Sequence, residues 1–323
     1  MKHLNTMLIA LFACTGSWCC ASESPHHDFV VARDGTGDFL TVQEAFDAVP
    51  DFRKKHTVIF VKDGVYKEKL VLPASKNGVV LIGQSVEKTI LTNDDYAQKK
   101  NRFGEDMGTT GSSGFFLFGN DFTARHITFE NGAGPVGQAV AVRVDGDRVF
   151  FDHCRFLGHQ DTLYSHGINS RQYYRQCTIE GTVDFIFGSS TAVFDRCEIV
   201  CRSGGYVTAA STQEGTAFGF VFFNCRITGS AEPGSVYLGR PWRPYARTVL
   251  IDCELGDIIR PEGWHNWGRT SNESTAFYAE YRNTGPGAQP DHRVPWSGQL
   301  TDDQRKTYTL DNIFKDWNPL VDE

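Results

Sequence analysis

Six short segments in the middle of the chain share one pattern, and their regular spacing constrains the fold more than any other feature. The segments are RHITFEN (125–131), DHCRFLG (152–158), RQCTIEG (175–181), DRCEIVC (195–201), FNCRITG (223–229) and IDCELGD (251–257). Their third residues follow one another at intervals of 27, 23, 20, 28 and 28 residues. Each segment alternates like a short strand, and such an interval is typical of one coil of a solenoid.

The third position of these segments predicts an internal ladder of free thiols. It is occupied in turn by Ile127, Cys154, Cys177, Cys197, Cys225 and Cys253. One repeat position falls on the same inward spot in every coil, and a cysteine there behaves as a small apolar residue. The chain has nine cysteines, which would otherwise suggest disulfides, and a metal or redox role is the other alternative. The regular placement of five of them favours the buried ladder.

Further short apolar runs lie between the repeated segments and complete the predicted coils. They are VVLIG (79–83), GFFLFG (114–119), AVAVRV (139–144), AVFD (192–195), GFVFF (219–223) and TVLID (248–252). None of this middle region has a 3.6-residue apolar period, so alternating strands and helices are a poor alternative. The 24 phenylalanines and 32 glycines also favour strands and turns. We therefore predict an all-β chain that forms a right-handed parallel β-helix.

An open solenoid needs a cap at each end. Near the N-terminus, TVQEAFDAV (41–49) predicts a short capping helix, with Thr41 and Glu44 as a capping box and Pro50 as its end. Its apolar residues share one helical face: Val42, Ala45, Phe46 and Val49. Near the C-terminus, LTDDQRKTYTLDNIF (300–314) predicts short helices that cover the other end or the flank.

The first residues are typical of an export signal. One lysine precedes an apolar run from Met7 to Ala13, and small residues follow. We expect a signal over residues 1–21, cleaved after Ala21, or lipid attachment at Cys14 within an imperfect LFAC box. Either outcome places the protein outside the cytoplasm, as a periplasmic, outer-membrane lipoprotein or secreted protein. Residues 22–323 would form a single domain, which we expect to be a monomer.

Charge narrows the range of partners. The net charge of −7 argues against nucleic acid, because binding by counterion release needs a basic surface. It does not exclude an anionic substrate, since local placement of arginine matters more than the total charge. A chain of 323 residues with 40% hydrophobic residues can also build a large core.

Polar residues interrupt the apolar strands at four places, and the solenoid spacing brings them together. They are Gln138, Gln160 with Asp161, Asp184 and Arg240. The intervals from Gln138 to Gln160, from Asp161 to Asp184 and from Asp184 to Arg240 are 22, 23 and 56 residues, close to one, one and two coils. We therefore expect these side chains to stack on one face and to form a site.

Two carboxylates without metal-ligand spacing nearby suggest glycoside hydrolysis or acyl transfer. The amides of Gln138 and Gln160 favour acyl transfer, because they can donate hydrogen bonds to a developing oxyanion. Arg240 could pair with one carboxylate and lower its pKa, which would keep that acid ionised while the other keeps a proton. Taken singly, Asp161 and Asp184 could end strands, the glutamines could form a stacking ladder and Arg240 could lie in a surface ion pair. Their convergence favours a site.

The segments that carry these residues resemble a known family. GQAVAVRV, GHQDTLY, GTVDFIFG and YLGRPWRPYARTV are similar to signature segments of the pectin methylesterases, or pectinesterases, of carbohydrate esterase family 8. The resemblance extends from VARDGTGDFLTVQEAFDAVP and GVYKEKL to RPEGWHNW and RVPW, and so covers almost the whole chain after the signal. The loop between Asp161 and Asp184 is longer than in the plant form, GPVGQ is shorter, and no inhibitor-like pro-region is present. We interpret this as a bacterial type.

The resemblance implies a role for each site residue. Asp184 would be the nucleophile, Asp161 the general acid and base, Gln138 and Gln160 the oxyanion hole, and Arg240 the partner of Asp184. The substrate would be methyl-esterified homogalacturonan, with neither a metal ion nor an organic cofactor. Residues that would contact or line the substrate are Thr109, Gln138, Arg240, Trp242, Tyr164, Phe187 and Trp264.

Three other functions remain as alternatives. A family relative could have drifted to another ester or thioester, but Trp242 and Trp264 retain the expected aromatic platform. A pectate lyase or polygalacturonase on the same solenoid would need an acidic calcium cluster or grouped catalytic Asp, Lys, Arg or His residues, which the matching segments lack. A noncatalytic pectin-binding protein would have lost one of the two acids, and both are present.

Overall fold

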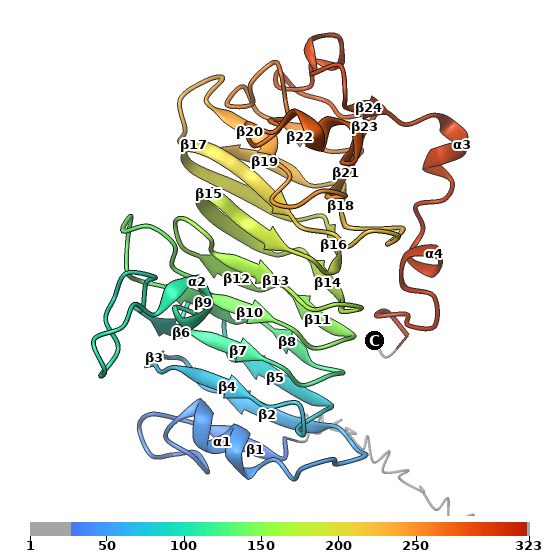
Figure 1. Ribbon diagram of the computed structural model, residues 1–323. Helices are drawn as coiled ribbons and strands as arrows, with labels where there is room; N and C mark the ends of the chain where they lie inside the picture. Colours follow the sequence, from blue (N-terminus) through green and yellow to red (C-terminus); the bar gives the residue numbers. More distant parts are fainter. Residues whose placement is uncertain (1–26, 322–323) are drawn as a thin grey trace, which may run out of the picture.

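The computed structural model describes residues 27–321, and these residues coil into a parallel β-helix (Figure 1). Strands stack along the solenoid axis in an 11-stranded and a 13-stranded sheet, and every pairing between named strands is parallel. The predicted all-β solenoid is therefore confirmed. The predicted export signal and its Cys14 lie outside the described residues. None of the helices within residues 27–321 is long and apolar enough to cross a membrane.

The 11-stranded sheet forms one wall of the solenoid. Its strands, in order, are β1 (Phe29–Val31), β2 (Thr57–Val61), β5 (Val79–Gly83), β8 (Thr123–Arg125), β11 (Val149–Asp152), β14 (Arg171–Arg175), β16 (Thr191–Asp195), β18 (Phe220–Phe223), β21 (Arg247–Ile251), β23 (Phe277–Tyr281) and β24 (Gly298–Gln299).

The 13-stranded sheet supplies the other two walls. One wall contains β3 (Gly64–Lys67), β6 (Thr89–Asn93), β9 (Thr128–Asn131), β12 (Arg155–Leu157), β19 (Arg226–Gly229) and β22 (Glu254–Leu255). The other, here called the site wall, contains β4 (Leu70–Leu72), β7 (Phe115–Leu117), β10 (Val142–Val144), β13 (Leu163–Ser165) and β20 (Val236–Gly239). The long strands β15 (Thr178–Gly188) and β17 (Glu198–Ala210) run through both walls and join them.

A sharp corner explains the repeated sequence pattern. In seven successive coils, a residue with positive φ follows the strand of the 11-stranded sheet: His126, His153, Gln176, Arg196, Asn224, Asp252 and Arg282, with φ between 48° and 56°. In the first six of these coils the next residue is buried in the core, and this is the predicted ladder position from Ile127 to Cys253. Its five cysteines are buried free thiols, as expected. Burial raises the pKa of Cys177 and Cys225 well above the ordinary value, so these thiols stay protonated.

The N-terminal cap forms as predicted. Helix α1 (Val42–Ala48) begins after Thr41, whose hydroxyl accepts a hydrogen bond from the Glu44 amide, and the Glu44 carboxylate accepts one from the Thr41 amide. Val42, Ala45 and Phe46 are fully buried against the first coil. Burying this apolar face shields the core at the open end of the solenoid.

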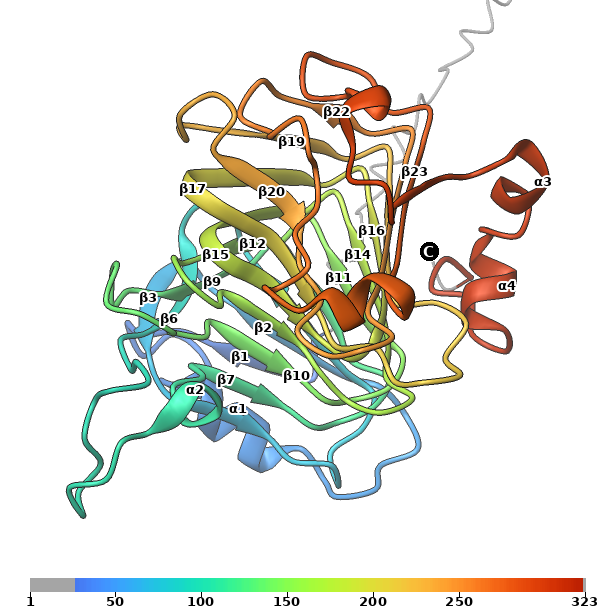
Figure 2. The same cartoon turned by 45° about the horizontal axis from the view of Figure 1, so that its top comes forward.

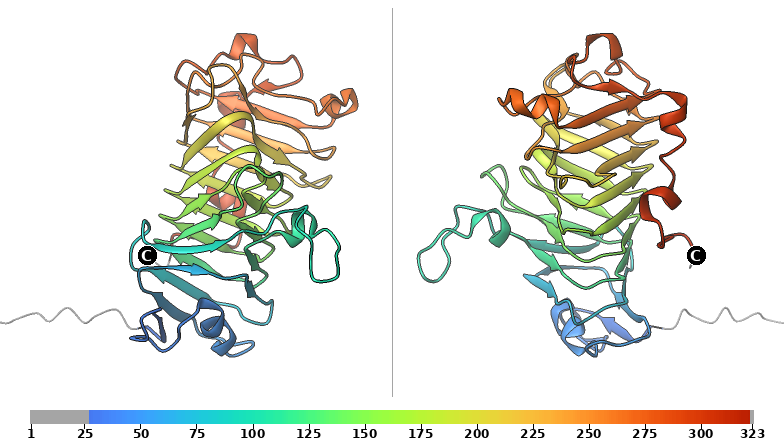
Figure 3. Two further views of the ribbon diagram at one scale, coloured as in Figure 1. Left: turned by 90° about the vertical axis from the view of Figure 1, so that its left-hand side faces the viewer. Right: turned by 45° about the vertical axis from the view of Figure 1, so that its right-hand side comes forward.

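The remaining helices lie outside the solenoid. Helices α3 (Asp302–Arg305) and α4 (Leu310–Phe314) run along its flank, and α2 (Gly108–Gly111) is on a loop that projects beside the site wall (Figures 2 and 3). Two 3₁₀ turns, η1 (Thr270–Ser274) and η2 (Pro290–His292), belong to C-terminal loops. Ile313 and Phe314 pack with Tyr173 on the outside of the 11-stranded sheet. The predicted C-terminal helices thus cover the flank.

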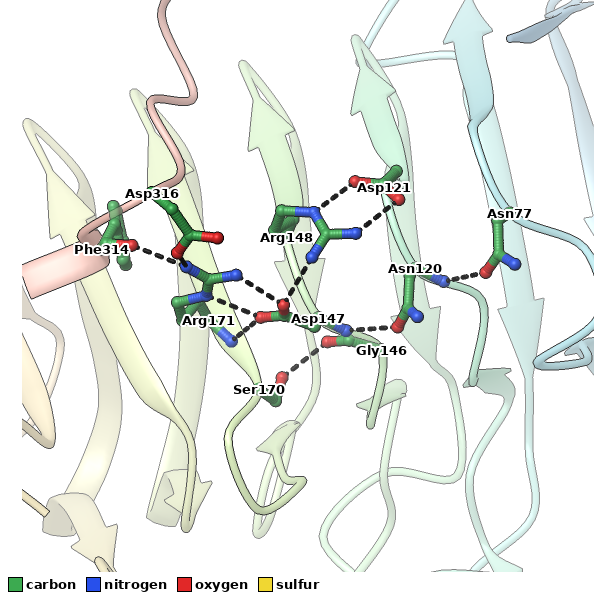
Figure 4. A network of polar contacts seen from close by, with 10 residues as sticks. All are labelled: Asn77, Asn120, Asp121, Gly146, Asp147, Arg148, Ser170, Arg171, Phe314 and Asp316. Carbon is green, nitrogen blue, oxygen red and sulfur yellow. Dashed lines mark hydrogen bonds and ion pairs between the residues drawn. The ribbon is translucent and has the colours of Figure 1, made fainter. Parts of the chain in front are cut away.

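A network of polar contacts ties the coils that carry Asn120, Asp147 and Arg171 to the C-terminal segment (Figure 4). The Asp147 amide donates to Asn120 Oδ1 (2.8 Å), and the Arg171 amide donates to Asp147 Oδ1 (3.0 Å). The Arg171 guanidinium binds Asp147 Oδ2 (2.7 Å), the Phe314 carbonyl oxygen (2.6 Å) and the carboxylate of Asp316. One partly buried cation therefore holds a coil and the C-terminal segment together.

We expect Arg171→Leu to lower the free energy of unfolding by about 1–3 kcal/mol, because it removes the guanidinium from Asp147, which keeps only Arg148 and the backbone amide of residue 171, and leaves the Phe314 carbonyl without this donor. The C-terminal segment should become a preferred site of proteolysis. Thermal unfolding and limited proteolysis measure the two effects. Arg226→Leu is the control. Arg226 is half exposed, and its distances of 3.5 and 3.8 Å to the nearest carboxylate oxygens are long for ion pairs, so little change is expected. Equal effects of both changes would contradict this account of Arg171.

Candidate active site

A cavity of about 460 Å³ opens on the site wall and holds all five polar residues that the coil spacing brought together. Its lining residues are Met107, Gly108, Thr109, Thr110, Gln138, Gln160, Asp161, Tyr164, Asp184, Phe187, Ala209, Arg240, Trp242 and Trp267. Thr109, Tyr164, Phe187 and Trp242, expected as substrate contacts, are among them. The residues come from seven separate segments between 107 and 267, and only the stacking of coils brings them together.

The backbone turns the two acids out of the site wall. Asp161 and Asp184 have φ values of +64° and +53°, in the left-handed region that few non-glycine residues adopt. Asp161 precedes β13, and Asp184 lies at an irregularity in the pairing of β15 with β17. Such a conformation costs on the order of 1–3 kcal/mol and is common at functional sites. The neighbouring backbone bridge between Gln138 and Gln160 places the two amides on adjacent coils.

Asp184 is held by Arg240 in a two-pronged ion pair. Arg240 Nε donates to Asp184 Oδ1 (2.8 Å), and Nη2 donates to Oδ2 (2.7 Å). The Asp184 side chain is only 8% exposed. Burial raises its pKa above the ordinary value, although the bonds and charge of Arg240 lower it in part. Arg240 thus lowers this pKa as predicted, but the net pKa is raised, because the loss of hydration outweighs one cation.

Asp161 differs from Asp184 because it lacks such a partner. Within residues 27–321, no side chain donates a hydrogen bond to its carboxylate, and the residue is 7% exposed. Burial raises its pKa well above the ordinary value, the negative charge of Asp184 raises it further, and Arg240 opposes both effects. Asp161 therefore keeps its proton to a higher pH than Asp184. This is the predicted order of the two acids.

Aromatic rings form the floor of the cavity. Tyr164 stacks on Phe187 across neighbouring strands, with ring centroids 4.2 Å apart, and the edge of Trp242 packs on both. Flat apolar rings beside polar groups suit a sugar chain.

The structure corrects the prediction for Trp264. This side chain is 1% exposed, packs in the core with its ring 4.5 Å from Tyr278, and does not line the cavity. Its backbone pairs with Gly239. Trp267 lines the cavity in its place. The sequence carries no clear signal for this difference, because Trp267 lies in a turn with a φ of +63° and the segment is not a regular strand.

The described residues contain no group of three or more His, Cys, Asp or Glu side chains that could bind a metal ion. The polar side chains named above that line the cavity supply two carboxyl groups, two amides and one guanidinium. A buried carboxylate with a fixed counter-ion, beside a carboxylic acid and amide donors, is suited to nucleophilic acyl transfer.

Comparisons with known proteins agree on one family. The model of the family described as Pectinesterase matches residues 28–316. "Pectinesterase 31" of Arabidopsis thaliana is 46% identical over 282 residues, which cover 85% of this chain and 88% of that protein. A "Pectinesterase/pectinesterase inhibitor" of Brassica campestris is 44% identical over 83% of this chain and 48% of its own length. This chain thus spans about half the length of that relative and of several others.

Solved structures give the same result. The pectin methylesterase from carrot has a TM-score of 0.82 and 36% identity, covering 90% of this chain and 94% of that one. Pectin methylesterase PemA from Erwinia chrysanthemi has a TM-score of 0.81 and 29% identity, covering 92% of this chain and all of that one.

We expect Asp161→Asn to stabilise the protein at neutral pH and not at acid pH. The pKa of Asp161 is raised in the folded state, so its carboxyl destabilises the fold as pH rises above the ordinary carboxyl range. An amide removes this cost. The melting temperature of the variant should therefore exceed that of the wild type by a few degrees at pH 7–8, and the difference should shrink towards pH 4.

Asp184→Asn is the matched control, because it removes a carboxylate that Arg240 binds. It should give no gain at neutral pH, since it leaves a partly buried guanidinium without its anion. Thermal unfolding between pH 4 and 8 measures both variants. A gain for Asp161→Asn that does not depend on pH would contradict the raised pKa.

Proposed function

The chain belongs to the pectinesterase family, a family of carboxylic ester hydrolases, and we propose that it removes the methyl esters of pectin through an acyl-enzyme on Asp184. The observation that carries the proposal is the pairing of Asp184 with Arg240 beside a carboxyl, Asp161, that keeps its proton. Related pectin methylesterases have been solved in complexes with a hexasaccharide, at 29–30% identity to this chain. These complexes support a sugar-chain substrate, and we propose that it is methyl-esterified homogalacturonan.

The first half of the reaction forms the acyl-enzyme. An oxygen of the Asp184 carboxylate attacks the ester carbonyl carbon at C6 of a galacturonate unit, and the carbonyl electron pair moves onto oxygen. The amide N–H groups of Gln138 and Gln160 stabilise this oxyanion. When the tetrahedral intermediate collapses, the carbon–methoxy bond breaks and Asp161 gives its proton to the departing oxygen. Methanol leaves, and an anhydride joins the substrate to Asp184.

The second half restores the enzyme. Asp161, now a carboxylate, accepts a proton from a water molecule, and the hydroxide attacks the acyl carbon of the substrate. The bond between that carbon and the Asp184 oxygen breaks, which frees the galacturonate unit with its carboxyl group. Arg240 stabilises the departing Asp184 carboxylate. Because Asp161 ends the cycle protonated and Asp184 ionised, the order of their pKa values suits both halves.

The rings and the loop with α2 provide the binding surface. Tyr164, Phe187 and Trp242 would offer apolar surface to sugar units, and Thr109 on α2 lines the same cavity. This mechanism needs neither a metal ion nor an organic cofactor. We propose that the enzyme acts as a monomer outside the cytoplasm, in keeping with the signal-like residues 1–21, and that it has no nucleic-acid partner.

We expect Asp184→Asn and Asp161→Asn to fold and to lose methanol release from highly methylated pectin. The loss should be about 10³-fold or more for Asp184, the nucleophile, and about 10²–10⁴-fold for Asp161, the acid and base. Circular dichroism verifies the fold. Acetyl-ester and acyl-CoA substrates, measured beside pectin, test whether the specificity has moved to another ester. Turnover near that of the wild type in either variant would contradict the mechanism.

A further inference from the structure

Arg240 is held between two aromatic rings at the same time as it binds Asp184. Its guanidinium carbon lies 3.8 Å from the ring centroid of Tyr206 and 3.8 Å from that of Trp267. Its Nε and Nη2 atoms, at the edge of the guanidinium plane, reach the two oxygens of Asp184. Tyr206 does not line the cavity; it lies on β17, beside Val183 on the neighbouring strand. The mechanism above does not use it.

We propose that Tyr206 is a positioning residue, which acts with Trp267 to hold the edge of Arg240 on the nucleophile and to keep water from both guanidinium faces. The inference rests on the proposed function of Asp184. An arginine side chain has many rotamers and stacks well on aromatic faces, so two rings restrict it to one plane. Without Tyr206, the guanidinium could turn towards water or towards the free carboxylates of partly de-esterified substrate.

The effect should be visible in the ionisation of Asp184. Burial already raises the pKa of this acid in spite of Arg240, so a looser or wetter Arg240 should raise it further. The other titratable groups that interact with this pair are Asp161, Tyr278 and His265. Burial and the charges of Arg240 and Arg260 lower the pKa of His265, whereas burial raises the pKa of Asp161 and of Tyr278. The acid limb of the pH profile of kcat should therefore move to higher pH.

The same stack offers a matched control. Tyr237, on β20, stacks on Tyr206 with ring centroids 5.2 Å apart, and both rings contact His265. Arg260, not Arg240, lies over Tyr237. Truncating Tyr237 therefore disturbs the stack and His265 without removing a ring from Arg240.

The test measures kcat for methanol release between pH 4 and 8. Tyr206→Phe should match the wild type, since it keeps the ring, whereas Tyr206→Leu should lose roughly tenfold in kcat at acid pH and shift the acid limb upward. Tyr206→Gln is a second variant without a ring, in case the first folds poorly. Tyr237→Leu should leave the limb in place. An unshifted limb in both Tyr206→Leu and Tyr206→Gln, or an equal shift in Tyr237→Leu, overturns the inference. If the wild type releases no methanol, the proposed function itself has failed.

A second observation concerns the projecting loop before α2. Gln98 Nε2 donates to Gln138 Oε1 (3.2 Å), and the Ala97 amide donates to the Gln138 carbonyl oxygen (2.8 Å). The Gly108 amide in turn donates to the Ala97 carbonyl oxygen (2.9 Å), which closes the base of the loop (Figure 3). The loop is thus tied to both the backbone and the side chain of Gln138.

We infer that Gln98 is also a positioning residue, because its donated hydrogen bond decides which end of the Gln138 amide faces the cavity. An amide has one donor end and one acceptor end. With its oxygen occupied by Gln98, Gln138 presents N–H groups to the oxyanion; turned over, it would present a carbonyl oxygen and repel that charge. This inference rests on the proposed role of Gln138.

Two substitutions of Gln98 distinguish the effect of its donated hydrogen bond from that of contact with Gln138 alone. Gln98→Glu is nearly isosteric and can only accept, so it should turn the Gln138 amide over and lower kcat by about 10²-fold with a smaller change in KM. Gln98→Lys can only donate and should keep kcat near the wild-type value. The loss in Gln98→Glu should persist from 0.05 to 0.5 M NaCl, because screening would remove a simple charge effect. Unchanged kcat in Gln98→Glu, or an equal loss in Gln98→Lys, overturns the inference, whereas an active Asp184→Asn would overturn the mechanism.

Discussion

The register between successive coils decides where the side chains of this protein lie. Each strand pairs in parallel with its equivalents one coil before and one coil after, so residues about one coil apart in the sequence become neighbours. In seven successive coils, a residue with positive φ turns the chain at the same place after the strand of the 11-stranded sheet. Tyr164 therefore meets Phe187, and Gln138 meets Gln160. The core and the cavity both depend on this one constraint.

The residues of the site adopt conformations and surroundings that each cost free energy. Two carboxyl groups are buried side by side with one guanidinium, and both acids have a left-handed backbone. The rest of the solenoid overcomes these costs through an extensive buried core. The imbalance of two acids and one cation also makes the chemistry possible, because it holds the proton on Asp161 and leaves Asp184 to Arg240. A second cation would weaken that difference.

Most of the fold and most of the cavity could be predicted because a solenoid converts sequence intervals into spatial neighbours. The strands, the capping helix and the convergence of Gln138, Asp161 and Asp184 all follow from local patterns and coil spacing. Coil spacing predicts only which residues lie on neighbouring coils. Trp264 was assigned to the cavity because a motif does not show which side chain faces inward, and Tyr206 and Gln98 were missed because they act through neighbours that are distant in sequence.

The sequence by itself determined the repeat, the ladder position and the residue types that chemistry requires, because these are properties of single segments and their intervals. Only the tertiary structure decided the balance of interactions at the site. Whether burial or Arg240 dominates the pKa of Asp184 depends on how much water the assembled coils exclude, and no interval in the sequence measures that. The contacts of Tyr206 and Trp267 with Arg240 were also decided by the tertiary structure. Strand β17 and the loop near residue 267 meet only when the coils have stacked.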